Sequence, residues 1–322
     1  MLTSRLLVWM CPIALMVIGM GAAGAQNYPN QTIRIVTGNP GGALDLSARM
    51  IAQGIAGSLG QQVIIENRMS AGGAIAVQTV IKAPPDGHTL LLYGGNIWLF
   101  QFMADNVPWD TIRDLAPITL AIKSPSVLLV HPSLPVKSVA ALIALAKSRP
   151  GELNEAGVGS GNATHMASEL FKSMAHVNIV RVPYKGGGPA LIALVGGEMQ
   201  LTFSVAGAAL PYVKSGRLRA LAITSAQPSP LIPELPTIAA SGLPGYEAES
   251  LFGLFAPANT PATIINRLNQ EIVRFLTMAE TRKRFLNSGL ETVGGSPEQL
   301  LAAVKSDMAK WGKLIKDVGI RR

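Results

Sequence analysis

Residues 32–55 have the sequence TIRIVTGNPGGALDLSARMIAQGI, and this stretch indicates the fold class. Its first six residues are mostly β-branched and apolar, as in a short buried strand. Farther on, Leu44, Ala48, Ile51 and Ile55 recur at spacings that put them on one face of a helix. A strand, a glycine-rich turn and an amphipathic helix in succession predict an α/β fold with largely parallel strands.

The same kind of short apolar run recurs along the chain, between stretches with a helical period. Further strands are expected at residues 63–67, 89–94, 126–131, 178–183, 199–205 and 219–224. From about Ala256 onward the pattern is helical, and Ile264, Ile265, Leu268, Ile272, Phe275 and Leu276 form a core-facing stripe. The sequence therefore predicts sheets with helices on their faces.

Proline-containing connections divide the chain into two lobes. They lie at Lys123-Ser124-Pro125 and between Gln227 and Pro236. A length of 322 residues fits roughly two domains of ordinary size. We expect one lobe from residues 26–125 together with 246–322, a second lobe from residues 126–245, and a hinge where the chain crosses between them.

The N-terminus has the three parts of a secretory signal. Arg5 is followed by an apolar run from Leu6 to Met20 and by the small residues Ala23-Gly24-Ala25. The apolar run is shorter than the roughly 20 residues that span a bilayer. We expect cleavage after Ala25 and a periplasmic protein. Cleavage would also remove Cys11, the one cysteine, so neither an internal disulfide nor a multi-cysteine metal site is possible.

Composition excludes several other classes of protein. With 48% hydrophobic residues the chain is far from a disordered composition. The formal net charge of +8 is spread over single Lys and Arg residues, without the basic runs typical of nucleic-acid binding. No nucleic-acid partner is expected.

The loop after the first strand is a candidate anion-binding site. Its glycines allow a tight turn of backbone N–H groups, and the following helix start carries a partial positive charge. The alternative is an ordinary strand-to-helix turn in which Asp45 is the N-cap. The candidate ligand-binding residues of this loop are Thr37, Gly38, Asn39, Gly41, Gly42 and Asp45.

A second candidate loop, Gly157 to His165, precedes another amphipathic helical pattern. It supplies neutral donors beside the helix start, namely Ser160, Asn162, Thr164 and His165. It lacks the third glycine of a dinucleotide fingerprint, so a nucleotide cofactor is not expected. Two such loops, one in each lobe, predict a cleft that closes around a small acid.

No known reaction centre occurs in the sequence. Ser160, His165 and Asp45 are the residue types of a nucleophilic triad, but Val158 stands where the G-x-S-x-G motif needs glycine. The four histidines have no H-E-x-x-H spacing, and no phosphate-binding P-loop motif is present. We therefore expect no enzyme, no cofactor and no metal.

Several motifs, in order along the whole mature chain, resemble one family. They are Val63 to Asn67 leading into Ala71-Gly72-Gly73, Pro85 to Leu91, Gly159 to Leu170, Val182-Pro-Tyr-Lys-Gly186, Pro257 with Thr260-Pro261, and Trp311-Gly-Lys313. This pattern resembles the Bug family, the extracytoplasmic solute receptors of tripartite tricarboxylate transporters. The resemblance implies a two-lobe, type II periplasmic-binding-protein fold, with mixed sheets, helices on both faces and a ligand cleft between the lobes.

The resemblance also implies a function and further site residues. Family ligands are small carboxylates, such as di- and tricarboxylates, held by the loops Gly38–Asp45 and Gly159–His165, with Tyr184 and Ser204 as further candidates in the cleft. The implied partners are the membrane subunits of a transporter, and we expect a monomer. Ala193 and Ser204-Val205-Ala206-Gly207 depart from the family pattern and leave the ligand's identity open. Two alternatives remain, a receptor that reports to a sensor and a periplasmic serine hydrolase that uses Ser160 and His165.

Overall fold

The opening strand and helix form where their sequence pattern predicts them, as β1 (Ile33–Thr37) and α1 (Ala43–Leu59). The structure is a computed structural model that describes residues 28–159 and 161–320. The predicted signal, residues 1–25 with Cys11, and Ser160 lie outside the described residues. The remaining strands are β2 (Val63–Asn67), β3 (Thr89–Gly94), β4 (Leu115–Val130), β5 (Asn154–Val158), β6 (Val180–Tyr184), β7 (Leu201–Val205), β8 (Arg219–Ile223), β9 (Glu249–Pro257) and β10 (Glu291–Thr292).

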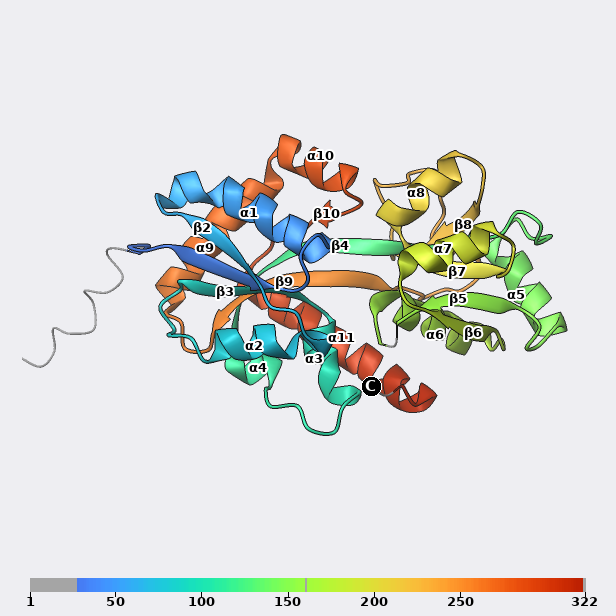
Figure 1. Cartoon of the computed structure of the whole chain (residues 1–322), viewed down its shortest axis with the longest axis horizontal. Coiled ribbons are helices and arrows are strands. Elements are labelled where there is room, and N and C mark those ends of the chain that lie inside the picture. The colour runs from blue at the N-terminus through green and yellow to red at the C-terminus, as the bar shows by residue number, and fades with distance from the viewer. Residues whose placement is uncertain (1–27, 160, 321–322) are drawn as a thin grey trace, which may run out of the picture.

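Helices cover both faces of the sheet in each of two lobes (Figure 1). Three helices, Ala262–Thr277, Ala279–Asn287 and Pro297–Val318, occupy most of the C-terminal region that the sequence predicts to be helical. The α-helices after α1 are α2 (Ala74–Ile81), α3 (Asn96–Leu99), α4 (Thr111–Asp114), α5 (Val139–Ser148), α6 (Ala163–Ala175), α7 (Gly187–Val195), α8 (Ala206–Lys214), α9 (Ala262–Thr277), α10 (Ala279–Asn287) and α11 (Pro297–Val318).

The strands form a mixed sheet in the order β2-β1-β3-β9-β4-β7-β5-β6, and β8 and β10 also pair with β4. Strand β1 is parallel to β2 and β3, and β5 is parallel to β6 and β7. All the described pairings of β4 and β9 are antiparallel. The predicted parallel units are therefore present in both lobes, joined through an antiparallel centre.

Strand β4 belongs to both lobes. Its first part, Leu115–Pro125, pairs with β9, and its last part, Ser126–Val130, pairs with β7 and β8. In Figure 1 it runs from the lobe that carries α1, α9 and α10 into the lobe that carries α5 to α8. The two lobes are thus connected by continuous sheet.

The apolar core is also shared between the lobes. One cluster of buried side chains includes Leu91 and Trp98 of the first lobe together with Phe171 and Phe203 of the second. Helix α11 adds Trp311 to this cluster and contacts α3, β4 and α6. A second cluster lies under α1 and α9, and it buries the predicted Ile264–Leu276 stripe. A third cluster lies under α7 and α8.

Four strands, β4, β5, β9 and β10, differ from the sequence prediction. The strand expected at residues 126–131 begins at Leu115, because the sheet accommodates Pro117 through a shift of register against β9. Strand β5 was not predicted, since its sequence NEAGV contains polar and glycine residues. Strand β9 is also absent from the prediction, and it lies almost wholly before the helical tail that the sequence predicts from about Ala256. The two-residue strand β10 is an exception within that tail.

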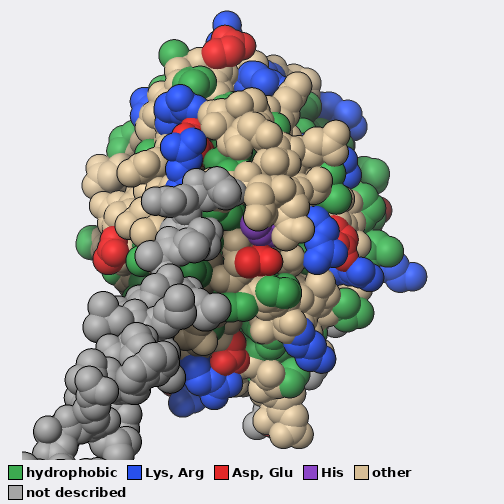
Figure 2. All heavy atoms as spheres, turned by 90° about the vertical axis from the view of Figure 1, so that its left-hand side faces the viewer, with side chains coloured by type: hydrophobic (Ala, Val, Ile, Leu, Met, Phe, Trp, Pro, Cys, Tyr) green, Lys and Arg blue, Asp and Glu red, His purple; other side chains and the backbone are tan. Residues whose placement is uncertain are grey.

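The surface shows mixed charge and the described helices include no membrane span. On the face drawn in Figure 2, Lys and Arg side chains occur at separate places among Asp, Glu and apolar side chains. Within residues 28–320, Ser160 aside, no helix is both long enough and apolar enough to cross a bilayer.

Candidate functional site

The first candidate loop leaves the sheet at Thr37. The Thr37 side chain is buried, and its Oγ1 donates to the carbonyl oxygen of Leu92 at 3.0 Å. Gly41 has a φ of 76°, which favours glycine. The N-cap of α1 is Gly42, which makes no side-chain cap, so the alternative that Asp45 is the N-cap is wrong.

Asp45 stabilises this loop from the first turn of α1. Its buried carboxylate accepts from the Gly41 N–H at 3.0 Å, from Asn67 Nδ2 at 2.9 Å and from Arg49 Nε at 3.0 Å. Hydrogen bonding to Arg49, and also to Gly41 and Asn67, lowers the pKa of Asp45 to about 2. Asn67 Nδ2 also donates to the Gly38 carbonyl oxygen at 2.9 Å. This helix start therefore has a carboxylate of its own.

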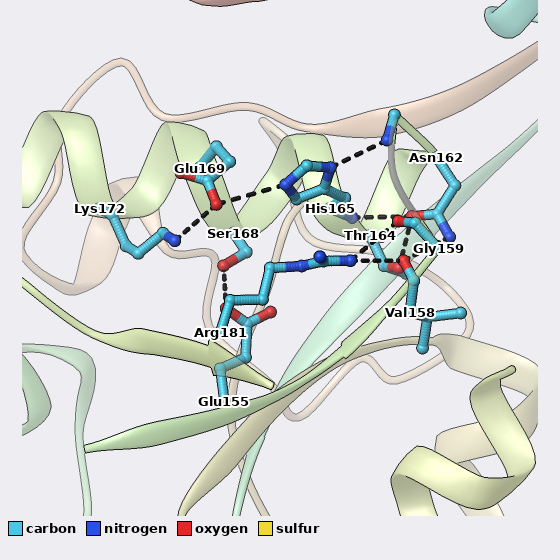
Figure 3. A network of polar contacts seen from close by, with 11 residues as sticks. Glu155, Val158, Gly159, Asn162, Thr164, His165, Ser168, Glu169, Lys172 and Arg181 are labelled. Carbon is cyan, nitrogen blue, oxygen red and sulfur yellow. Dashed lines mark hydrogen bonds and ion pairs between the residues drawn. The ribbon is translucent and has the colours of Figure 1, made fainter. Parts of the chain in front are cut away.

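The second loop is organised by Asn162, the N-cap of α6 (Figure 3). Asn162 Oδ1 accepts from the His165 N–H at 2.9 Å and from Thr164 Oγ1 at 2.9 Å. Asn162 Nδ2 donates to the Val158 carbonyl oxygen at 2.8 Å. The side chains of Asn162 and Thr164 thus close the turn with neutral groups, which leaves helix N–H groups without an internal anion.

Both ring nitrogens of His165 are engaged. Nδ1 accepts from the Gly161 N–H at 2.9 Å, so the ring proton lies on Nε2, 3.4 Å from Glu169. Lys172 Nζ is 2.5 Å from the same carboxylate. Although burial raises the pKa of Glu169, the bonds from His165 and Lys172 lower it below its usual value. His165 thus connects the loop to α6.

The guanidinium group of Arg181 binds the second loop from the neighbouring strand β6. Arg181 Nη2, on β6, donates to the carbonyl oxygens of Val158 at 3.0 Å and Gly159 at 2.8 Å (Figure 3). A Cβ atom at Gly157 would lie 2.4 Å from Arg181 Nε, so glycine is needed for this arrangement. Glu155, beside it on β5, is buried and bonded to Ser168, and burial raises its pKa.

A cavity of about 500 Å³, which we call the helix-end cavity, lies at the starts of three helices. The first turns of α6, α7 and α8 all contribute to its wall. No residue in its lining is charged. The lining is Val158, Asn162, Ala163, Thr164, Gly187, Gly188, Ala190, Leu191, Thr202, Phe203, Ser204, Val205, Ala208 and Tyr212.

A second cavity of about 260 Å³, the inter-lobe cavity, adjoins the first. Asn162 and Ala163 line both cavities. The other walls are Gly94, Gly95, Asn96 and Leu99 after β3, Gly161 and Met166, Ala248 to Phe252 at the start of β9, and Asp307 and Trp311 of α11.

The structure thus brings together some of the predicted site residues. Asn162, Thr164 and Ser204 line the helix-end cavity, whereas Tyr184, partly buried at the end of β6, lines neither cavity. Thr37, Gly38, Asn39, Gly41, Gly42 and Asp45 lie on the other lobe and line neither cavity.

Other lining residues gave no signal in the sequence. Tyr212, Glu249 and Asp307 come from segments far apart in the chain and belong to no recognised motif. In the part of the chain that the structure describes, no group of three or more His, Cys, Asp or Glu side chains could hold a metal ion.

Comparison with known proteins identifies the family. Residues 47–320 match the model of the tripartite tricarboxylate transporter family receptor. Protein BugT of Bordetella pertussis is 35% identical over 300 residues, which cover 92% of each chain. A protein from the tcbD-tcbE intergenic region of a Pseudomonas species is 38% identical over 290 residues, 89% of this chain and 86% of that protein.

Solved structures of periplasmic binding proteins are also similar to this chain. Rpa4515 of R. palustris, solved with adipate, has a TM-score of 0.78 and 36% identity, and the match covers 92% of this chain and 99% of that one. MatC of Rhodopseudomonas palustris, solved with bound malate, has a TM-score of 0.73 and 30% identity, with 89% and 100% covered. The chain therefore belongs to the tripartite tricarboxylate transporter receptor family, the Bug family of periplasmic binding proteins.

Proposed function

We propose that this protein is a receptor that captures a small carboxylate between its two lobes and delivers it to the membrane subunits of a transporter. The observation that carries the proposal is the helix-end cavity. The starts of α6, α7 and α8 point their partial positive charges at one space, and the lining includes the neutral hydroxyl groups of Thr164 and Ser204. A carboxylate fits such a wall, and the absence of a lining Lys or Arg keeps release possible.

The relatives support this ligand class. Two of the similar solved structures hold adipate and malate, which are both small carboxylates. Recognition through helix ends depends on the carboxylate group and leaves the rest of the ligand to the other walls of the cleft.

Closure brings the first loop toward the ligand. We assign residues 26–125 with 246–322 to one lobe and residues 126–245 to the other, because β4 changes partners between Pro125 and Ser126. In Figure 1 the N-terminal end of α1 faces the lobe that carries α7 and α8. In the closed form the backbone of the first loop, which surrounds the Asp45 side chain, contacts the ligand. The residues of this loop are Thr37, Gly38, Asn39, Gly41 and Gly42. The ligand favours the closed form to the extent that it binds that form more tightly.

Export and partnership complete the proposal. The chain is made with a signal that is cleaved after Ala25, and it acts in the periplasm as a monomer. Its closed form is what the membrane subunits of a tripartite tricarboxylate transporter recognise.

Calorimetry on the mature chain tests ligand capture. Adipate and malate are titrated against their neutral diamides, and we expect saturable heats for at least one acid and none for the diamides. Small-angle scattering with the bound acid should give a smaller radius of gyration. Absence of binding by every small acid would overturn the proposal, as would turnover of simple esters by the wild-type protein.

A charged substitution at Gly188 tests the site itself. Gly188 lies in the first turn of α7, and a Cβ atom there meets nothing within 4 Å. Gly188→Asp should support the helix start yet remove acid binding, because its carboxylate occupies the anion position. Gly188→Asn, which has the same shape without the charge, is the control and should retain most of the binding.

A further inference from the structure

The two adjoining cavities have opposite polarity. The helix-end cavity has three helix starts and an uncharged lining, whereas the inter-lobe cavity is lined by two carboxylates, Glu249 and Asp307. Since Asn162 and Ala163 line both cavities, a molecule held by the start of α6 can extend from one into the other.

Asp307 is fixed in place by two tryptophans. Oδ2 accepts from Trp98 Nε1 at 3.2 Å, and Oδ1 accepts from Trp311 Nε1 at 3.1 Å. Burial raises the pKa of Asp307 to about 6. At neutral pH this group is therefore mainly a carboxylate, and both of its oxygens already accept a hydrogen bond from the protein.

Glu249 has remaining capacity for a ligand. Its side chain is only 8% exposed, and the enclosed Oε1 atom receives no hydrogen bond of normal geometry. Lys123 Nζ lies 3.1 Å from Oε1 and 3.2 Å from Oε2 as an ion-pair partner. This lysine is shared with Glu291 Oε2 at 3.7 Å, so one positive charge serves two carboxylates.

These charges discriminate between possible ligand ends. A second carboxylate in the inter-lobe cavity would face Glu249 and Asp307 in a site partly withdrawn from water, where like charges repel strongly. An ammonium group would instead donate to Glu249 and supply the missing positive charge. Burial raises the pKa of Glu249, and a cation beside it would relieve that cost.

Resting on the proposed function, we propose that the preferred ligand is a zwitterion, with its one carboxylate at the helix ends and an ammonium group against Glu249. The ligand is thus a compact amino acid and carries no second negative charge. The negative charge of Asp307 attracts the ammonium group electrostatically, and Glu249 makes the direct contact with it.

Matched pairs of ligands test this preference by calorimetry. The two members of each pair have the same number of carbon atoms, and one carboxylate is replaced by an aminomethyl group: succinate and γ-aminobutyrate, glutarate and δ-aminovalerate, adipate and ε-aminocaproate. For the best-fitting length we expect the amino acid to bind the wild-type protein about tenfold more tightly or better. Glu249→Gln should remove most of that preference by weakening the amino acid. Glu247→Gln is the control, since Glu247 is an exposed acid on the same segment that lines neither cavity.

The outcomes separate this inference from the proposed function. Equal or tighter binding of the dicarboxylate in every pair would overturn the inference and leave the receptor for acids intact. An amino-acid preference that survives in Glu249→Gln would overturn the role of Glu249. No binding by either class would remove the proposed function and the inference together. The wild-type comparison decides the preference even if Glu249→Gln does not fold.

Discussion

The loops Gly38–Asp45 and Gly159–His165 have the same local plan, a strand followed by glycines and a helix, yet they treat the helix start differently. In the first loop, Asp45 places a carboxylate against its own helix and accepts from Gly41, Asn67 and Arg49. In the second, the neutral Asn162 closes the turn, and the cation Arg181 binds loop carbonyls from behind.

This difference shows that a glycine-rich helix start is not by itself an anion site. The positive end of α1 is already compensated by Asp45, whereas the described residues at the start of α6 include no carboxylate. The two loops are therefore expected to have different roles in ligand binding. We expect the second loop to bind the acid and the first loop to form a wall that closes over it.

Giving the second loop a carboxylate of its own should have the largest effect. Ala163 is the first residue of α6 and lines both cavities. In Ala163→Asp, two like charges about 4 Å apart cost about 4 kcal/mol at an effective dielectric constant of about 20. We expect acid binding to weaken by at least about a hundredfold in calorimetry. Ala163→Asn is the control, and equal loss in both variants would indicate a steric effect.

Removing the carboxylate of the first loop should cost stability. In Asp45→Ala, the Gly41 N–H and the Asn67 amide lose their acceptor, and we expect a loss of about 2 to 3 kcal/mol in the free energy of unfolding. Urea unfolding at constant m-value measures it. Asp45→Asn retains one acceptor and should lose less. Wild-type stability in Asp45→Ala would show that the loop does not depend on this side chain.

The neutral cap of the second loop should matter less. Asn162→Ala removes the acceptor for the His165 N–H, and loss of such a cap costs about 1 to 2 kcal/mol. Asn162→Asp keeps the oxygen that accepts from the His165 N–H but loses the donation to the Val158 carbonyl oxygen. It should therefore retain only part of the stability of the cap, and it should weaken acid binding. If Asn162→Ala unfolds at the wild-type urea concentration, the cap does not organise this loop.

The smallest expected effect is the dependence on acid pH that Asp45 gives to the first loop. The pKa of Asp45 is lowered in the folded protein to about 2, so its ionised form contributes stability above the unfolded pKa near 4. That contribution is lost as the pH falls from about 4 toward 2, and it is modest because Arg49 is exposed to solvent. The stability difference between wild type and Asp45→Asn should shrink over this range. A difference that stays constant with pH would contradict the assignment.

Patterns within a short stretch of sequence predict those helices and strands that do not depend on distant parts of the chain. The β1–loop–α1 unit, the strands β2 and β3 and the apolar face of α9 follow from hydrophobic period and glycine position. The first half of β4 does not, because Pro117 and Lys123 are poor signals for a central strand, and only the pairing with β9 accounts for them.

The site divides in the same way. The position of Asn162 and Thr164 at the start of a helix can be predicted, because a helix start is a local feature. The bonds of Asp45 to Asn67, and the meeting of Glu249 with Asp307 across the inter-lobe cavity, join segments far apart in the chain. No spacing in the sequence contains that information.

The position of α11 in the shared core has a consequence for how the chain reaches its native state. Trp311 and Ile315 belong to α11, yet they share a core cluster with Val36 of β1, which lies far away in the chain. Contacts between segments so far apart in the chain form late, and they delay the completion of this core until α11 is available. In a family of periplasmic binding proteins, this dependence on a distant segment would favour export of the chain before its core is complete, with α11 completing the fold.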